Sequence, residues 1–496
     1  MINILLIGLG PHARRIHFPV VGQLESKLHA QIVAAVDLES QRRTIDAYLR
    51  ENQSDIKPLY LDKEVSRISH NSLTPALVKK LDKIVDANEA TAVFICTEPI
   101  AHIAYAKWAM DRSLNVLMDK PISTPLNLAT DDSSIEQLKE DYYTLLRLYE
   151  DKLKEGKKVV FELMTQRRYH PAFLKIKSLV DEISSTTGCP ITSFQTTHCD
   201  GQWRMPSEIV DQDYHPYNQG YGKCSHSGYH SIDVIDWLVR SSYAQSNHKA
   251  NTAEVISNFV YPNDFISQLP LDKYEKFFGS NDPIKYSENF LRSEYSTYGE
   301  LDAQIGLTYH DDSNSKITIG QFNLLHNSFS QRNWPSAIGR DLYKGNGRIR
   351  HEFHYLVQGP FQTIIFESFQ SEEILNEQTS HSGVGGEYHL DVHIFRNSKL
   401  FPTWKSYEKV TIDDLSTQIL KGYSRGHQED ARKQAITAFL NAVDNRKEER
   451  LSDLKDQQGS IEILYGVYKS ALLRKNNKNP IVRVKIGKRD EKQPKD

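Results

Sequence analysis

The opening segment constrains the fold of this chain more than any other. The apolar run Ile2–Ile7 leads directly into the turn GLGPHA at residues 8–13. A short continuous apolar run is typical of a buried parallel strand, and glycines after it permit a tight turn into a helix. The amino end of such a helix attracts phosphate groups, because its free amides and its dipole face them. The segment therefore predicts a nucleotide-phosphate site at a strand end.

The rest of residues 1–125 alternates strands with helices, which predicts a parallel sheet covered on both faces, a Rossmann dinucleotide-binding domain. Asp37 ends the second strand and can accept hydrogen bonds from ribose hydroxyls, which favours NAD. Arg42 follows closely and could instead meet the 2′-phosphate of NADP. The expected cofactor contacts are Gly8, Gly10, Pro11, His12, Ala13, Asp37, Arg42, Thr97, Pro99, His102, Asp119 and Lys120.

Residues 126–473 predict a second, α+β domain. Period-two alternation of apolar residues is typical of half-buried strands and indicates a large, mostly antiparallel sheet, interrupted by a helix at Tyr229–Val239. Segments with this alternation lie at 192–198, 303–309, 316–324 and 362–368.

Three polar segments depart from these patterns. Insertions are expected near 127–142 and 262–298, because neither shows a clean period. The basic segment 474–496 is expected to be a flexible tail.

Composition excludes several classes of protein. The chain is 39% hydrophobic and 25% charged, with a net charge of -3, which indicates a soluble protein and gives no reason to expect nucleic acid or membrane as a partner. No apolar run is long enough to span a bilayer, and the amino terminus has neither the basic region nor the cleavage site of a signal peptide. Four cysteines make no disulfide framework. We therefore expect a cytoplasmic location.

A second strand end carries the candidate proton-transfer group. The strand Asn115–Met118 ends at Asp119-Lys120-Pro121, so an amine lies at the sheet edge where the cofactor is expected. Burial beside a nicotinamide ring would disfavour the charged form of Lys120, and such a lysine can exchange a proton with a substrate hydroxyl. Pro121 in the cis form would fix this turn. A solvated surface lysine is the alternative.

The segment KCSHSGYHSID at 223–233 holds a second candidate group. His226 and His230 are four residues apart, so a helical turn would place both on one face. Asp233 could hydrogen-bond His230 and fix its tautomer. A histidine here could share proton transfer with Lys120.

Other polar side chains are candidates for the substrate pocket. Arg168 could equally form a structural ion pair, and the residues after the strand ending at His198 could belong to the core or its rim. The expected substrate contacts are Arg168, His198, Trp203, Arg204 and Tyr229.

Together these motifs resemble the Gfo/Idh/MocA oxidoreductase family, which includes glucose–fructose oxidoreductase and inositol dehydrogenase. The similar segments are Gly8-Leu9-Gly10 with Ala13, Thr97-Glu98-Pro99 with His102, Asp119-Lys120-Pro121, QRRYHP at 166–171, GYHSID at 228–233 and GSIEILYGVYKS at 459–470. The resemblance is strong over residues 1–240 and thinner over 300–410.

This resemblance implies a C-terminal open-faced sheet that forms homodimers or homotetramers. It also implies hydride transfer between NAD(P) and a secondary alcohol or ketone of a sugar, cyclitol or sugar derivative. Lys120 would be the proton-transfer lysine and His230 the active-site histidine. The chain departs from the family pattern twice, with Asp119 in place of Glu and His226 in place of Asp.

Three other functions stay open. An imine reductase would use the same cofactor chemistry, and a non-catalytic NAD(P)-binding sensor would keep the fold without turnover. A metal hydrolase would have to use Cys199, Cys224, His226 and His230. Their spacing matches no compact zinc pattern, so we expect no metal.

Overall fold

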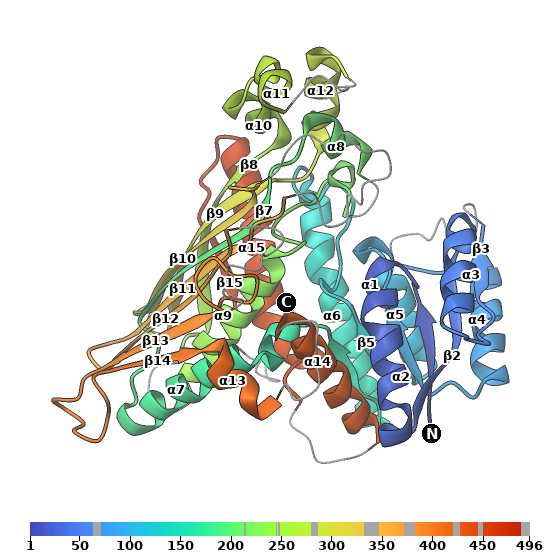
Figure 1. Cartoon of the computed structure of the whole chain (residues 1–496), viewed down its shortest axis with the longest axis horizontal. Coiled ribbons are helices and arrows are strands. Elements are labelled where there is room, and N and C mark those ends of the chain that lie inside the picture. The colour runs from blue at the N-terminus through green and yellow to red at the C-terminus, as the bar shows by residue number, and fades with distance from the viewer. Residues whose placement is uncertain are drawn as a thin grey trace. The chain divides into compact units, whose positions relative to one another are not determined.

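The computed structural model describes the chain outside residues 63–70, 213–214, 245, 247–248, 279–285, 332–346, 372–381, 420–426, 445–449 and 488–496. It divides into two compact units (Figure 1). The first comprises Met1–Pro125, Gln137–His170 and Gln428–Gln457, and the second comprises Leu126–Glu136, Pro171–His427 and Gln458–Asp496.

A parallel six-stranded sheet forms the centre of the first unit, in the order β3-β2-β1-β4-β5-β6. The predicted Rossmann fold is therefore confirmed. Its strands are β1 (Ile2–Ile7), β2 (Ala30–Leu38), β3 (Leu59–Leu61), β4 (Ala92–Ile95), β5 (Asn115–Met118) and β6 (Phe161–Leu163). Its helices include α1 (Pro11–Arg15), α2 (His17–Leu28), α3 (Arg42–Glu51), α4 (Pro75–Ala87) and α5 (His102–Asp111).

Two later helices complete this unit. Most of α6 (Asp132–Lys154) and nearly all of α14 (His427–Val443) belong to it. Phe439 of α14 meets Phe94 of β4 edge to face, with ring centroids 5.7 Å apart. Segments distant in sequence thus supply part of the core of this unit, in addition to the predicted domain of residues 1–125.

The second unit is built on a nine-stranded sheet in the order β14-β13-β12-β11-β7-β10-β9-β8-β15. Every neighbouring pair is antiparallel except β7 and β10, which run parallel, so the predicted mostly antiparallel sheet is confirmed. The strands are β7 (Ser193–Gln202), β8 (Thr252–Val260), β9 (Asp302–His310), β10 (Lys316–Asn327), β11 (His351–Gln358), β12 (Gln362–Phe369), β13 (Asp391–Arg396), β14 (Tyr407–Thr411) and β15 (Val482–Lys485).

Helices cover one face of this sheet. Burial alternates along β11 and much of β12, as expected when one face packs on a core and the other stays partly exposed. The helix α15 (Gln458–Lys475) packs against β8, and α9 (Gly228–Ser242) packs against α15 and against α7 (Pro171–Thr187) (Figure 1).

The described parts of the 262–298 segment, residues 262–278 and 286–298, form a small helical module rather than an irregular insertion. Its helices are too short for a clear hydrophobic period, but they share a core in which Phe265, Tyr274 and Leu291 are fully buried. They are α10 (Pro262–Gln268), α11 (Leu271–Phe278) and α12 (Glu288–Glu294), beside α8 (Pro206–Asp211). The remaining helix of the unit is α13 (Ile412–Ile419).

The prediction of a flexible tail over residues 474–496 was wrong for the residues that the structure describes. Arg474 and Lys475 end α15, and Val482–Lys485 pairs with β8 as an edge strand, because its apolar residues alternate with basic ones. Residues 488–496 lie outside the described part of the chain. A search of the described helices for one that is both long and apolar enough to cross a membrane finds none.

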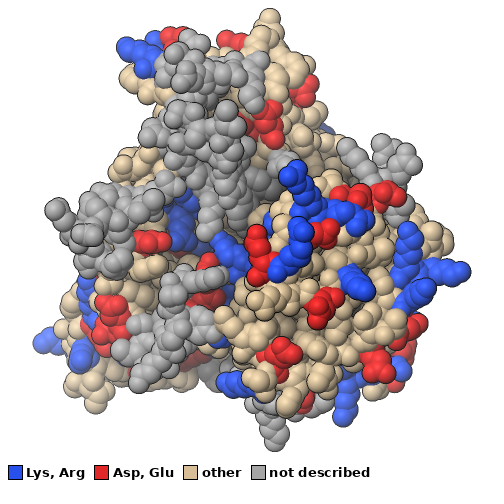
Figure 2. Space-filling view, turned by 45° about the vertical axis from the view of Figure 1, so that its right-hand side comes forward, with Lys and Arg blue, Asp and Glu red and all other residues tan. Residues whose placement is uncertain are grey.

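Acidic and basic side chains are interspersed on the surface that Figure 2 shows. Neither sign forms a continuous field among the described residues of that face, in keeping with the small net charge of -3. This distribution gives the face no strong attraction for a polyanion.

Candidate active site

The glycine turn after β1 has the geometry of a phosphate cradle. Gly8 has φ +91°, and a Cβ there would lie 2.7 Å from the carbonyl carbon and oxygen of Cys96, so only glycine fits. Gly10 precedes α1, and a Cβ built on it would meet nothing within 4 Å. Pro11 occupies the first helical position, as predicted. The turn thus brings backbone close to open space at a helix amino end, where a pyrophosphate would fit.

Asp37 is fixed beside this turn at the end of β2. Its carboxylate accepts hydrogen bonds from the amides of Leu9 at 2.6 Å and Leu38 at 2.7 Å. Burial raises the pKa of this carboxyl above its usual value. Two backbone donors orient the carboxylate without using all its lone pairs, so it can still accept a bond from a ribose hydroxyl.

Arg42, the alternative contact for a 2′-phosphate, is already paired. Its Nη2 donates to Glu39 Oε2 at 2.7 Å, and its guanidinium lies 4.1 Å from the ring centre of Tyr60. The carboxylate of Glu39 therefore offsets the positive charge of Arg42, which a 2′-phosphate would need as its partner.

Positive groups surround the half-buried imidazole of His12, the residue after the cradle proline. Burial lowers the pKa of His12 well below its usual value, with further lowering from His17, Arg432, Arg15 and Lys120. A neutral imidazole among three cations marks a positive potential, which suits a pyrophosphate. Arg432 lies on α14, far along the chain, so sequence reasoning did not find it.

The ends of β4 and β5 are linked by His102. Its ring nitrogens lie 2.8 Å from the carbonyl oxygen of Pro121 and 3.0 Å from that of Thr97, and the side chain is fully buried. His102 therefore holds the two segments together from inside. The buried hydroxyl of Thr97 makes no hydrogen bond, so it can take a partner from a bound ligand.

Lys120 is half-buried and follows β5 directly, and its peptide bond to Pro121 is cis, as predicted. Asp119 Oδ1 lies 3.6 Å from His17 Nε2. His12, His17 and Asp119 each offer a ligand atom, all within 4.8 Å of one another. The cations beside this group disfavour a divalent ion, so we assign it no metal.

In the second unit, the segment before α9 is fixed by Glu300. A Cβ on Gly222 would lie 1.8 Å from the carbonyl oxygen of Glu300, so this close approach requires glycine. The amide of Lys223 donates to that carbonyl at 2.9 Å, and the amide of Cys224 donates to Glu300 Oε1 at 2.8 Å. Burial raises the pKa of Glu300 to about 7.

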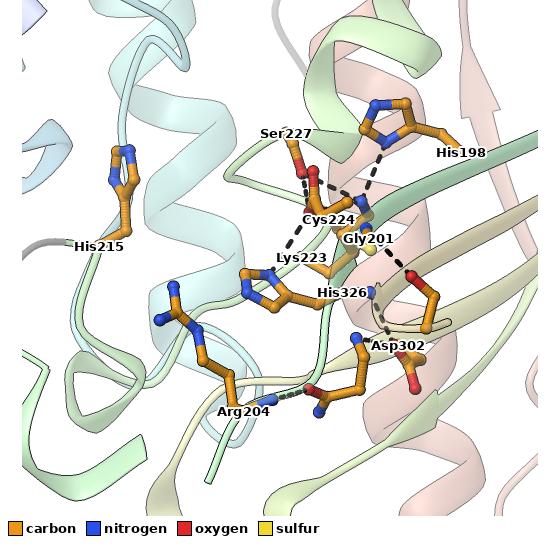
Figure 3. Close-up of polar contacts among 12 residues, drawn as sticks. His198, Gly201, Arg204, His215, Lys223, Cys224, Ser227, Asp302 and His326 are labelled. Atoms are coloured by element: carbon orange, nitrogen blue, oxygen red, sulfur yellow. Dashed lines mark hydrogen bonds and ion pairs between the residues drawn. The ribbon is translucent and has the colours of Figure 1, made fainter. Parts of the chain in front are cut away.

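Lys223 is fully buried at the centre of a polar network (Figure 3). Its ammonium donates to Asp200 Oδ2 at 2.7 Å, to Ser227 Oγ at 3.0 Å and to His198 Nδ1 at 2.9 Å. Burial alone would raise the pKa of Asp200, but Lys223 and neighbouring cations hold it well below its usual value. His198, predicted to contact substrate, thus supports this network.

His226 lies in the turn before α9 and is enclosed by aromatic rings. Its ring centroid is 4.7 Å from that of His215, 5.2 Å from Tyr221 and 5.7 Å from Tyr217. His230 is half-buried in the first turn of α9. Because α9 begins at Gly228, His230 lies on this helix and His226 lies in the turn before it. The spacing had predicted that a helical turn would place both on one face, but the two histidines do not share one continuous helix.

Comparison with protein families tests the identity of the first unit. Residues 2–143 match the profile of the oxidoreductase family with an NAD-binding Rossmann fold, GFO_IDH_MocA. This part of the chain is therefore similar to the Gfo/Idh/MocA oxidoreductase family. The resemblance proposed from the motifs is confirmed, and so is the expectation of an NAD-type cofactor for this family. A comparison with curated protein sequences finds no match.

Solved structures of this family share the fold. The WlbA dehydrogenase of Bordetella pertussis, solved with NADH and UDP-GlcNAcA, is 14% identical, with a TM-score of 0.56 over 98% of each chain. An oxidoreductase of Agrobacterium radiobacter, solved with NAD+, L-tartaric acid and magnesium, is 13% identical, with a TM-score of 0.53 over 98% of each. The scyllo-inositol dehydrogenase of Lactobacillus casei is 13% identical, with a TM-score of 0.52 over 98% of each. At this identity the likeness shows the fold alone.

Some residues predicted to contact substrate have structural partners. Arg168 is fully buried and donates to the carbonyl oxygen of Leu451 at 2.8 Å, which favours its structural alternative. Trp203 donates to the hydroxyl of Tyr274 at 3.2 Å and so holds the helical module. Tyr229 is fully buried. Their contact with substrate stays a prediction.

Asp233, predicted to orient His230, accepts a hydrogen bond from the hydroxyl of Ser460 at 3.0 Å. The predicted bond from His230 to Asp233 stays a prediction. All four cysteines are free thiols. Among the described residues, the groups with metal-ligand geometry do not include Cys199, Cys224, His226 and His230, so the metal-hydrolase alternative gains no support.

Sequence reasoning missed several groups of the second unit. Lys223 could have been found from the sequence, because it begins the segment 223–233 that was already predicted to hold a catalytic group. The structure buries its neighbours in that segment. His326 and Asp302 carried none, because they come from strands whose pairing brings them beside Asp200.

Proposed function

We propose that this protein is an NAD-dependent dehydrogenase or reductase that acts on a secondary alcohol or ketone of a sugar, a cyclitol or a sugar derivative. One observation carries the proposal: the first unit presents a glycine cradle with open space at Gly10 and, on the same sheet, an amine at the end of β5. The family match of residues 2–143 supports the same cofactor class.

NAD is the proposed cofactor in preference to NADP. The carboxylate of Asp37 is oriented by the amides of Leu9 and Leu38 and can accept a bond from a ribose hydroxyl. The same carboxylate would repel a 2′-phosphate, and Glu39 already neutralises Arg42. Bound NAD would supply the acceptor for the hydrogen removed from the substrate carbon.

Lys120 is proposed to exchange the hydroxyl proton of the substrate. The half-buried Lys120 lies two residues after the end of β5, so its backbone position is defined by the sheet. His230 is proposed to share this proton transfer together with His226, which lies four residues before it in the same segment.

The substrate class rests on the relatives. The inositol dehydrogenase and the dehydrogenase solved with UDP-GlcNAcA share the fold with this chain, and the Agrobacterium oxidoreductase was solved with a hydroxy acid, L-tartaric acid. Each of these compounds carries secondary hydroxyl groups.

We also propose that the protein is cytoplasmic and that it forms a homodimer or homotetramer through the open face of the nine-stranded sheet.

The test combines cofactor binding with turnover. We expect Lys120→Ala to keep binding NAD(H), because Gly8, Gly10 and Asp37 are untouched, and to lose about 100-fold or more of kcat in a screen of sugars and cyclitols. Lys80→Ala, an exposed lysine on α4, is the matched control and should keep full activity. Unchanged turnover of the Lys120 variant would contradict the assigned role.

The same screen separates the sensor alternative. A wild-type protein that binds NAD(H) tightly but turns over no sugar, cyclitol or imine would be a cofactor-binding sensor. Turnover confined to imines would identify an imine reductase.

A further inference from the structure

Three strand ends of the second unit meet beside Lys223. The strands β7 and β10 run parallel, so Asp200 and His326 lie near the same edge of the sheet, and Asp302 begins the neighbouring β9. Asp302 Oδ1 accepts the backbone amides of His326 at 2.7 Å and Asn327 at 3.2 Å. This carboxylate fixes the backbone of both residues.

The side chains of these two residues have unused donors. His326 is 7% exposed and neither of its ring nitrogens makes a hydrogen bond. Asn327 is 5% exposed, and its Oδ1 accepts the amide of Arg204 at 2.8 Å while its Nδ2 makes no hydrogen bond. Buried polar groups in native proteins nearly always have a partner, so two adjacent exceptions indicate a place for a ligand.

Positive charge surrounds His326. The charged groups that act on it include Asp200, with Nδ1 of the ring 3.5 Å from its Oδ2, and the cations Arg204, Lys223 and Arg348. Asp302 adds a second carboxyl beside the His326 backbone. Lys223 at 2.7 Å and Arg348 at 3.5 Å both pair with Asp200, so its charge is compensated. Burial lowers the pKa of His326 well below its usual value, and the three cations lower it further. The potential at this imidazole is therefore positive.

The location is next to the segment predicted to be catalytic. The ring of Tyr217 lies 5.5 Å from His326 and 5.7 Å from His226, centroid to centroid, and so stands between them. In Figure 3 the side chains of Arg204 and His326 extend toward each other, on the side where His215 lies.

We propose that His326 and the amide of Asn327, in the field of Arg204, bind an oxyanion carried by the substrate, a carboxylate or a phosphate. This inference rests on the proposed function, because it assigns the substrate of that enzyme to the acidic sugars or sugar phosphates. Oxygen lone pairs of the anion would accept the N–H at Nε2 of the neutral His326 ring and an N–H of Asn327 Nδ2, and its charge would match the excess of cations. These residues would be specificity-determining and take no part in proton transfer.

The test measures binding of D-glucuronate, glucose 6-phosphate and glucose to the full chain loaded with NADH, by calorimetry near neutral pH. We expect one or both anionic probes to bind about tenfold or more tighter than glucose. Preference for glucuronate would identify a carboxylate, and preference for glucose 6-phosphate would identify a phosphate. Equal binding of all three probes, or no binding of the anionic ones, would overturn the proposal.

Two variants assign the effect to these residues. Asn327→Asp keeps the acceptor for the Arg204 amide but replaces the donor with a charge that repels an anion, and His326→Phe keeps a ring against Tyr217 without N–H groups. Both should abolish the preference, whereas Asn323→Asp, the same change at an exposed position of β10, should keep it. Retained preference in the folded Asn327 variant would refute the site.

Failure of the proposed function gives a different result. If NADH does not bind or no sugar is turned over, but the anion preference and its loss in both variants persist, the oxyanion site stands and the dehydrogenase assignment falls. Turnover of neutral sugars without any anion preference would leave the enzyme assignment and remove the site.

Discussion

At the scale of single residues, the cofactor cradle depends on two glycines with different requirements. Gly8 is held in the left-handed region at φ +91°, against the backbone of Cys96. Gly10 borders open space instead. The sequence predicted both glycines from their place after an apolar strand, and the structure separates a folding role from a binding role.

Substitution by alanine should separate these roles. Gly8→Ala should lower the free energy of unfolding by about 1–3 kcal/mol, because the new Cβ would overlap the carbonyl of Cys96 in a disfavoured conformation. Gly10→Ala should unfold like the wild type but bind NAD about tenfold more weakly, since its Cβ fills space meant for the pyrophosphate. Chemical denaturation and NAD titration check both. Equal loss of stability in the two variants would contradict this distinction.

At the scale of elements, the segment before α9 is anchored to β9 through one buried carboxyl. Glu300 Oε1 accepts the amide of Cys224 at 2.8 Å and the hydroxyl of Tyr468 at 2.9 Å. Sequence reasoning identified α9 and its histidines but not this anchor. Glu300 is distant from the segment along the chain, and the pairing of strands brings it close. Pairing of distant strands, which no local pattern encodes, sets the chemistry here.

The anchor predicts a pH dependence of stability. Folding raises the pKa of Glu300 from its usual 4.5 to about 7, through burial. The folded state therefore holds a proton that the unfolded state loses, so the contribution of this group is full below pH 4.5 and is lost as the pH rises through about 7. Urea unfolding of the wild type and of Glu300→Gln should show a shallower decline for the variant over this range. Parallel pH curves would show that Glu300 keeps its ordinary pKa in the folded protein.

At the scale of the whole molecule, the sequence predicted both sheets but not the composition of the units. Strand and helix periods are local signals, so β1, β2, β4 and β5 of the first sheet and β7, β9, β10 and β12 of the second could be predicted from them. The return of α14 to the first sheet could not, because its buried residues Ile436 and Phe439 pack against a strand far away in sequence. The helical module at 262–298 was missed for the reason that its helices are short.

The role of α14 gives a prediction for truncated chains. Residues 1–170 alone should not unfold cooperatively, because removal of α14 exposes the apolar surface that Ala435, Ile436 and Phe439 cover. The same residues joined through a flexible linker to 428–457 should fold and bind NAD. Circular dichroism during thermal unfolding and NAD titration compare the two chains. A stable, NAD-binding 1–170 fragment would show that α14 is dispensable.

The central claim is that the amine of Lys120, at the end of β5, exchanges the proton of the substrate hydroxyl. A crystal structure of the protein with NADH and a substrate found in the turnover screen tests this most directly. We predict that Lys120 Nζ lies within hydrogen-bond distance of the reacting oxygen, beside the nicotinamide ring. A Lys120 side chain directed away from that oxygen in every protomer would contradict the account.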